Sequence, residues 1–465
     1  MVNEELVCLP GLGLGNHEGK NSRSPAVDDC ILCGQHQPFL NNPFRKKQDN
    51  IKAHQAHPRP TIGTTPGQKR SCPFAGLRNQ VRKRAFNLEE DLMRGKAPDC
   101  LKGINGTPFI PTGIVEWLDE RTAANLRGGG PGVPYRDTVF DRVPVRIFTD
   151  EQAGGETSKQ PAIVLYHGGG FIWGSPDSHH ALASQIAREL KAVFISVDYR
   201  LAPKHPFPAA IDDCTAAAVW FLEHLSDYNV DPARVAIMGD SAGGNLAAAT
   251  AQRLTFDQRY RDLPKVKLQV LIYPVLQGFD FQTPSYQWNG HYPTLLNKVL
   301  MTWMIDLYIN GRKGGPRVQD AMQINSHTSA AAKRTPLVQR CLSHDLVPDE
   351  FKQSGYEAPS TNFGDEDVYD EIKGALWNPD FAPLMQEDLR GLPEAYILTA
   401  EYDVLRDDGI MYAKRLEKAG VPVTLKDYLR GFHGMFGTGD SCFMACTPMG
   451  DQSFWDFIAF AKKRL

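Results

Sequence analysis

The segment 239–244, Gly-Asp-Ser-Ala-Gly-Gly, has the residue types and spacing that would present a serine hydroxyl as a nucleophile. The apolar run 234–238 before it predicts a short buried strand, and the alanine-rich run 245–249 after it predicts a helix. A strand, a tight Gly-x-Ser-x-Gly turn and a helix form a nucleophile elbow, because glycine permits the sharp reversal of the chain. We therefore predict that Ser241 attacks a carbonyl carbon.

A run of glycines follows the apolar strand predicted over 161–166. Acyl transfer places negative charge on the former carbonyl oxygen, and backbone N–H groups fixed at that position stabilise the charge. Successive glycines let the backbone approach a substrate closely. The sequence leaves open which of these N–H groups point at the oxygen, and the expected donors are Gly168, Gly169, Gly170 and Ala242. His167, which opens the run, is expected to brace the loop by hydrogen bonding rather than to transfer a proton.

A serine nucleophile needs a base, and the base needs an acid that orients it. Two further strands are predicted, over 394–400 and 421–425, and each is followed by such a group. Asp403 and His433 each lie just past a strand end, where open α/β sheets place their active sites. Glu401, Asp407 and Asp408 compete with Asp403 for the role of the acid. The last two are expected to open the next helix, because acidic residues suit a first turn.

Together with Tyr-Arg-Leu-Ala-Pro at 199–203, these motifs resemble the hormone-sensitive-lipase branch of the α/β-hydrolases. Within that branch, the segments 284–287, 390–393 and 402–409 resemble the arylacetamide deacetylase-like group. The resemblance extends from about Tyr135 to the C-terminus. It implies a carboxylic-ester hydrolase with the triad Ser241, Asp403 and His433. Asp240 also fits this branch, and we expect it to support the loops together with His167.

The remaining sequence predicts an α/β fold in which strands and helices alternate after about Tyr135. Helices are predicted over 181–188, 211–224 and 242–253, and strands over 192–199 and 266–273. This order favours a mostly parallel sheet covered by helices on both faces, and the resemblance implies that it is the eight-stranded sheet of an α/β-hydrolase. The expected catalytic core comprises 135–274 and 391–465.

The segment 275–390 is too long for a plain connection between two strands and is rich in aromatic and methionine residues. We interpret it as a helical cap over the active site, with a helix over 296–309. A cap with an apolar inner face favours small, uncharged, moderately hydrophobic esters or acetylated arylamides as substrates. The sequence does not show which of its residues face the substrate.

The first 90 residues differ in composition from the rest and are rich in Gly, Pro, Asn, Gln and basic residues. Such a stretch buries too little apolar surface to fold, so we expect 1–90 to be disordered and 91–134 to be a helical segment associated with the cap. The resemblance implies an anchor in the endoplasmic reticulum membrane, but no apolar run of about 18 residues occurs. We therefore expect a soluble chain, with peripheral membrane contact and oligomeric state left open.

Composition limits the other partners. The chain has 465 residues, 42% hydrophobic and 23% charged, and a net charge of −3. This balance provides no basic field for nucleic acid, and we expect no nucleic-acid partner. Nine scattered cysteines do not form a disulfide framework. Cys30 and Cys33 have the spacing of metal ligands, but their neighbours complete no convincing four-ligand set, and we predict no metal and no cofactor.

Two other interpretations stay open at this stage. One is a small-ligand receptor that uses the same fold without catalysis, as plant gibberellin receptors do. Those receptors lack the catalytic histidine, whereas His433 stands here in a full Gly-Phe-His-Gly setting. The other is an inactive chain in which an altered N-terminus has removed a needed anchor or part of the cap.

Overall fold

The computed structural model describes residues 133–149, 159–290, 296–353, 355–438 and 447–465. The predictions for 1–90, for nearly all of 91–134 and for the Cys30–Cys33 pair lie outside these residues. Among the described residues, no helix combines the length and the apolar character that a membrane crossing requires.

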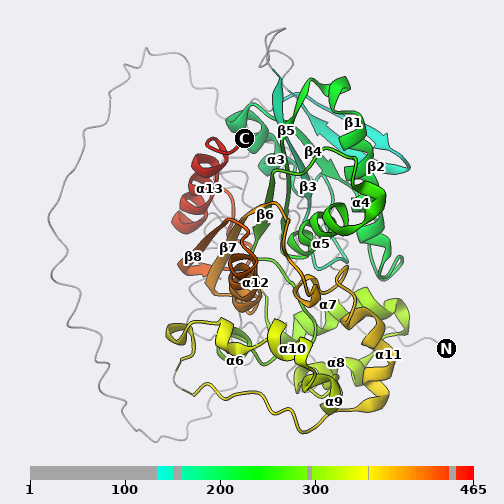
Figure 1. The fold of residues 1–465 in the computed structure, drawn as a ribbon, viewed down its shortest axis with the longest axis vertical. Helices are drawn as coiled ribbons and strands as arrows, with labels where there is room; N and C mark the ends of the chain where they lie inside the picture. The colour runs from blue at the N-terminus through cyan, green and yellow to red at the C-terminus, as the bar shows by residue number, and fades with distance from the viewer. Residues whose placement is uncertain (1–132, 150–158, 291–295, 354, 439–446) are drawn as a thin grey trace, which may run out of the picture. The chain divides into compact units, whose positions relative to one another are not determined.

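A single eight-stranded sheet runs through the described residues (Figure 1). Its order is β1-β2-β4-β3-β5-β6-β7-β8, with β1 and β2 antiparallel to their neighbours and all later strands parallel. The strands are β1 (Tyr135–Phe140), β2 (Val143–Phe148), β3 (Gln160–Tyr166), β4 (Val193–Val197), β5 (Val230–Asp240), β6 (Leu268–Ile272), β7 (Glu394–Tyr402) and β8 (Val423–Phe432). The prediction of a mostly parallel α/β sheet is confirmed.

Helices cover both faces of this sheet because the parallel strands are apolar on both sides. In β3, Val164 packs into the core on one face, whereas Ile163 and Leu165 pack into the core on the other. The first core is closed by α4 (Ala209–Glu223), α5 (Ala242–Phe256) and α12 (Arg406–Lys418). The second is closed by α3 (His180–Leu190) and α13 (Pro448–Ala461).

A helical insertion separates β6 from β7 and lies at one end of the sheet (Figure 1). Its helices are α6 (Pro284–Asn289), α7 (Lys298–Asn310), α8 (Pro316–Gln323), α9 (Ala330–Lys333), α10 (Pro336–Cys341) and α11 (Glu366–Leu376). Helix α7 corresponds to the helix predicted over 296–309. Short 3-10 turns occupy Leu225–Tyr228, Gln258–Tyr260, Gly311–Lys313, His344–Leu346, Asp349–Phe351 and Pro383–Met385.

The last strand is longer than the sequence predicts. We predict 421–425, but β8 continues to Phe432 and pairs with β7 up to Tyr402. The missed half contains Lys426, Asp427 and Arg430, whose polar side chains suit the exposed edge of a sheet and conceal the apolar pattern of a strand. The consequence for the site is that His433 follows the strand directly.

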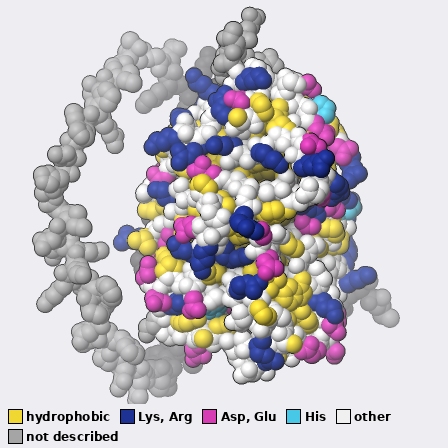
Figure 2. All heavy atoms as spheres, in the orientation of Figure 1, with side chains coloured by type: hydrophobic (Ala, Val, Ile, Leu, Met, Phe, Trp, Pro, Cys, Tyr) yellow, Lys and Arg dark blue, Asp and Glu magenta, His cyan; other side chains and the backbone are white. Residues whose placement is uncertain are grey.

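Figure 2 shows basic and acidic side chains interspersed with apolar ones over the visible face of the molecule.

Candidate active site

Ser241 occupies a strained turn between β5 and α5. It has φ 56° and ψ −120°, a conformation that a residue with a side chain rarely adopts, and its N–H donates to Ile272 O at 2.8 Å. A Cβ at Gly243 would lie 1.9 Å from Tyr166 O, and one at Gly239 would lie 2.1 Å from Gly243 O. The turn therefore requires glycine at both positions, as the motif predicts.

The loops after β7 and β8 bring an imidazole and a carboxylate to this turn. His433 Nε2 lies 2.9 Å from Ser241 Oγ, and His433 Nδ1 lies 2.7 Å from Asp403 Oδ2. Asp403 is fully buried, and its second oxygen, Oδ1, accepts the Leu405 N–H at 2.9 Å. The Tyr273 ring packs against the imidazole at a centroid distance of 4.6 Å. Serine, histidine and aspartate thus form one continuous chain of hydrogen bonds.

The three competing carboxylates are engaged elsewhere. Glu401 Oε2 accepts the Arg430 N–H at 2.6 Å, and Asp407 pairs with the buried Arg406 at 2.9 Å. Burial raises the pKa of Asp408 to about 8, so this group is largely protonated at neutral pH and unsuited to stabilising an imidazolium. As predicted, the two aspartates lie in the first turn of α12. Of the four carboxylates, Asp403 is the one that contacts His433, and it is therefore the candidate for the orienting acid.

The glycine loop lies beside the elbow because β3 and β5 are paired up to Tyr166 and Gly239. Gly168 does not fit its predicted role, since its N–H donates to Asp240 Oδ1 at 2.9 Å and is not free for a substrate oxygen. Within the described residues, Gly169, Gly170 and Ala242 keep N–H groups that donate to no protein acceptor. These three are the remaining candidates for stabilising an oxyanion.

A buried polar network supports the loop. Asp240 Oδ1 also lies 3.1 Å from His179 Nε2, a partner that the sequence analysis missed because no local pattern precedes α3. Burial by itself raises the pKa of Asp240, but His179 and the hydrogen bond from the Gly168 N–H outweigh burial and hold the pKa below its usual value. Asp240 therefore stays ionised and contacts both the Gly168 N–H and His179. Its support of the loop stays a prediction.

His167 is neutral and structural in this arrangement. Burial, together with the nearby His179, lowers the pKa of His167 to about 3. Its ring stacks on Tyr199 at 4.2 Å, and Nδ1 lies 2.8 Å from Gly168 O. The Tyr199 hydroxyl donates to His167 O at 2.7 Å. The tyrosine of the 199–203 motif thus braces the loop that holds the candidate oxyanion donors.

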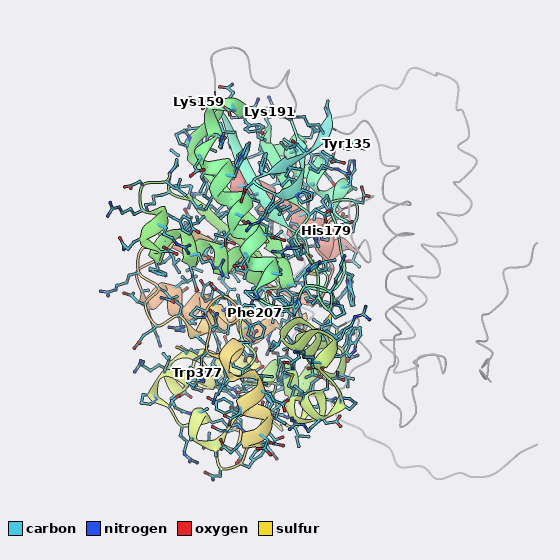
Figure 3. All side chains as sticks on the ribbon, turned by 90° about the vertical axis from the view of Figure 1, so that its right-hand side faces the viewer. Tyr135, Lys159, His179, Lys191, Phe207 and Trp377 are labelled. Atoms are coloured by element: carbon cyan, nitrogen blue, oxygen red, sulfur yellow. The ribbon has the colours of Figure 1, made fainter. Side chains whose placement is uncertain are left out.

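Away from the candidate triad, four basic side chains lie around one cavity. A cavity of about 290 Å³ is lined by Lys159, Lys191, Arg234 and Lys462. It lies at the N-terminal edge of β3, and Figure 3 shows Lys159 and Lys191 at the opposite end of the sheet from His179 and the insertion. Among the described residues, no group of three or more potential ligands could hold a metal ion.

Comparisons with known proteins agree with this architecture. A family model described as the alpha/beta hydrolase fold matches residues 163–339 and 366–437. The chain is 43% identical over 311 residues to neutral cholesterol ester hydrolase 1 of Rattus norvegicus, covering 65% of this chain and 74% of that protein. It is 40% identical over 305 residues to arylacetamide deacetylase of Bos taurus, covering 64% and 73%.

Solved structures point the same way. The esterase of Pyrobaculum calidifontis has a TM-score of 0.56 and 26% identity, covering 83% of this chain and 97% of its own. The sheet order and the elbow define an α/β-hydrolase fold. The chain belongs to the α/β-hydrolase family, in the group of carboxylic-ester hydrolases that contains the arylacetamide deacetylases. The predicted resemblance is confirmed.

Proposed function

We propose that this protein hydrolyses carboxylic esters through an acyl-serine intermediate, with Ser241 as nucleophile, His433 as general base and Asp403 as the orienting acid. The observation that carries the proposal is the hydrogen-bonded chain from Asp403 Oδ2 through His433 to Ser241 Oγ, with distances of 2.7 and 2.9 Å. These distances lie in the range that proton transfer to a base requires.

In the first half-reaction, His433 Nε2 takes the Ser241 proton while Oγ bonds to the ester carbonyl carbon. The N–H groups of Gly169, Gly170 and Ala242 hold the oxygen that becomes negative, and removing one such donor typically costs about a hundredfold to a thousandfold in rate. Asp403 keeps the proton on Nδ1 and stabilises the imidazolium. The carbon–oxygen bond to the alcohol then breaks, and His433 donates its proton to the departing oxygen.

In the second half-reaction, water takes the place of the alcohol. His433 removes a proton from the water as its oxygen attacks the acyl carbon, and the same N–H groups hold the oxyanion again. The bond to Ser241 Oγ breaks, the serine regains its proton from His433, and a carboxylic acid is released. Each step uses only groups of this chain and a water molecule.

The substrates we propose are uncharged, moderately hydrophobic esters and acetylated arylamides. Two observations support this range. The named relatives act on cholesterol esters and arylacetamides. In addition, Met304 of α7 lies against Gly170 of the glycine loop, since its sulfur would be 2.1 Å from a Cβ at that glycine. The insertion therefore brings an apolar side chain to the edge of the site.

Covalent labelling tests the proposal. Purified protein is treated with a fluorophosphonate probe, and Ser241→Ala is compared with Ser226→Ala, which removes an exposed hydroxyl outside the site. We expect Ser226→Ala to label like the wild type and Ser241→Ala not to label. Labelling of Ser241→Ala at another serine would overturn the assignment. A series of p-nitrophenyl esters of increasing acyl length then measures the substrate range.

A further inference from the structure

Helix α6 of the insertion contacts the loop that carries the candidate acid. Asn289, the last residue of this helix, is fully buried. Its Nδ2 donates to Glu401 O at 3.0 Å and to Asp403 O at 3.1 Å. One amide group from the insertion thus holds two backbone carbonyls of the acid loop, one of them belonging to Asp403 itself.

A second residue of α6 holds the other half of the loop. The hydroxyl of Ser285, also fully buried, donates to Val404 O at 2.7 Å. Its backbone N–H donates to Asp407 Oδ2 at 2.5 Å. The four contacts of Ser285 and Asn289 therefore cover residues on both sides of Asp403.

The orientation of the Asn289 amide follows from these contacts. Carbonyl oxygens accept hydrogen bonds, so only the NH₂ side of the amide can face Glu401 O and Asp403 O. The other amide atom, Asn289 Oδ1, is buried and has no hydrogen-bond partner among the described residues. A buried acceptor without a partner costs free energy. The side-chain hydrogen bonds of Asn289 are thus made to the acid loop.

From this geometry we infer that Ser285 and Asn289 are positioning residues, which hold Asp403 at the distance from His433 that catalysis requires. The inference rests on the proposed function, because it assigns a role toward the same triad. Asp403 has its carboxylate fixed by the Leu405 N–H and its carbonyl fixed by Asn289. The insertion is therefore part of the catalytic framework as well as a neighbour of the substrate site.

The chemistry explains why these contacts matter for rate. The Asp403–His433 bond of 2.7 Å is formed by a side chain at the end of a strand, so a shift of the loop moves the carboxylate directly. A misplacement of about 1 Å in a catalytic group can lower a rate by about a hundredfold. Substrate binding does not depend on this bond to the same degree.

Three variants test the inference in the full-length protein. Asn289→Leu keeps the approximate volume and removes the donor, and Asn289→Asp keeps the shape but replaces the donor by an acceptor facing two carbonyls. Gln287→Ala is the matched control on the same helix, because Gln287 Nε2 donates to Gln282 O and Glu357 O, outside the acid loop. Active-site titration gives the concentration of folded, competent enzyme for each protein.

We expect kcat for p-nitrophenyl acetate to fall by about tenfold to a hundredfold in both Asn289 variants, with KM changed by less than about threefold. The rate of fluorophosphonate labelling should fall by the same factor as kcat. The downfield proton resonance of the His433 Nδ1–H should broaden or shift in these variants. Gln287→Ala should retain the wild-type kcat, labelling rate and resonance.

The outcomes separate this inference from the proposed function. If Ser241→Ala still labels, the triad assignment fails and the inference fails with it. If the wild type labels at Ser241 but both Asn289 variants keep kcat, labelling rate and the proton resonance, the triad stands and the positioning role is refuted. Loss of activity in proportion to the loss of titratable sites, with unchanged kcat per site, also refutes it, because it indicates a purely structural role.

Discussion

Replacing Asp403 by asparagine is expected to trap His433 in the wrong tautomer. In the native protein, Asp403 Oδ1 accepts the Leu405 N–H at 2.9 Å, and Oδ2 accepts from His433 Nδ1 at 2.7 Å. An asparagine must keep an oxygen toward the Leu405 N–H, because an NH₂ group there would face another donor. Its NH₂ then faces Nδ1, which has to accept the hydrogen bond. The ring proton moves to Nε2, where it faces Ser241 and blocks the base.

The size of the effect follows from this reversal. The volume of residue 403 is unchanged and both hydrogen bonds persist, so we expect little change in folding. The base, however, is protonated on the nitrogen that must accept the serine proton. A wrong tautomer in a Ser-His-Asp triad lowers kcat by about 10⁴-fold. This factor corresponds to about 5.4 kcal/mol of transition-state stabilisation.

The assay is steady-state hydrolysis of p-nitrophenyl acetate at neutral pH, with thermal unfolding measured in parallel. Glu401→Gln is the matched control, because its side-chain oxygen can still accept the Arg430 N–H and the residue competes for the acid role in the sequence. We expect the control to retain activity within about threefold. Asp403 is not the orienting acid if the Asp403→Asn protein keeps more than about a tenth of the wild-type kcat, or if the Glu401→Gln protein loses most of its kcat.

Two further predictions concern stability. Gly243→Ala should lower the free energy of unfolding by more than about 3 kcal/mol in urea titrations, because its Cβ would lie 1.9 Å from a carbonyl oxygen. Gly374 lies in helix α11, and a Cβ added there would have no atom within 4 Å. Gly374→Ala should therefore raise the free energy of unfolding by about 0.5–1 kcal/mol. Equal destabilisation by the two glycine substitutions would contradict the steric argument. Burial, opposed by Asp280, lowers the pKa of Lys298 to about 8. Between pH 8 and 10.5 the unfolded chain binds more protons at this lysine than the native protein, so the wild type should gain stability relative to Lys298→Met, by up to about 3 kcal/mol. A constant difference in the free energy of unfolding between the wild type and Lys298→Met over this pH range would contradict the prediction.

Local patterns in the sequence predict the elements that carry the site. The elbow around Ser241 follows from a strand, a Gly-x-Ser-x-Gly turn and a helix, all within about 20 residues, and the clash distances at Gly239 and Gly243 explain the motif. The strands β3 to β7 and the helices α3, α4 and α5 are likewise predicted, because each has a clear apolar pattern over its length. The exposed half of β8 lacks such a pattern and is missed.

Contacts between distant segments are beyond the reach of these patterns. The sequence offers Gly168 as an oxyanion donor, but the side chain of Asp240, 72 residues away, takes its N–H. His179 and Asn289 have no motif that marks them, and their roles depend on partners 61 and 114 residues away in the chain. Pairings of this kind are decided when the sheet is assembled, since strand order sets which loops meet.

The sequence itself contains the order of the chemical groups, which is serine, then carboxylate, then imidazole. It also contains the glycines that allow the turns. The choice of Asp403 among four nearby carboxylates is a property of the tertiary structure. Burial, the Leu405 N–H and the buried amide of Asn289 direct this one side chain toward His433, whereas the surroundings of the other three direct them elsewhere. Short-range sterics thus encode the turn of the candidate nucleophile, and long-range packing decides which side chains lie beside it.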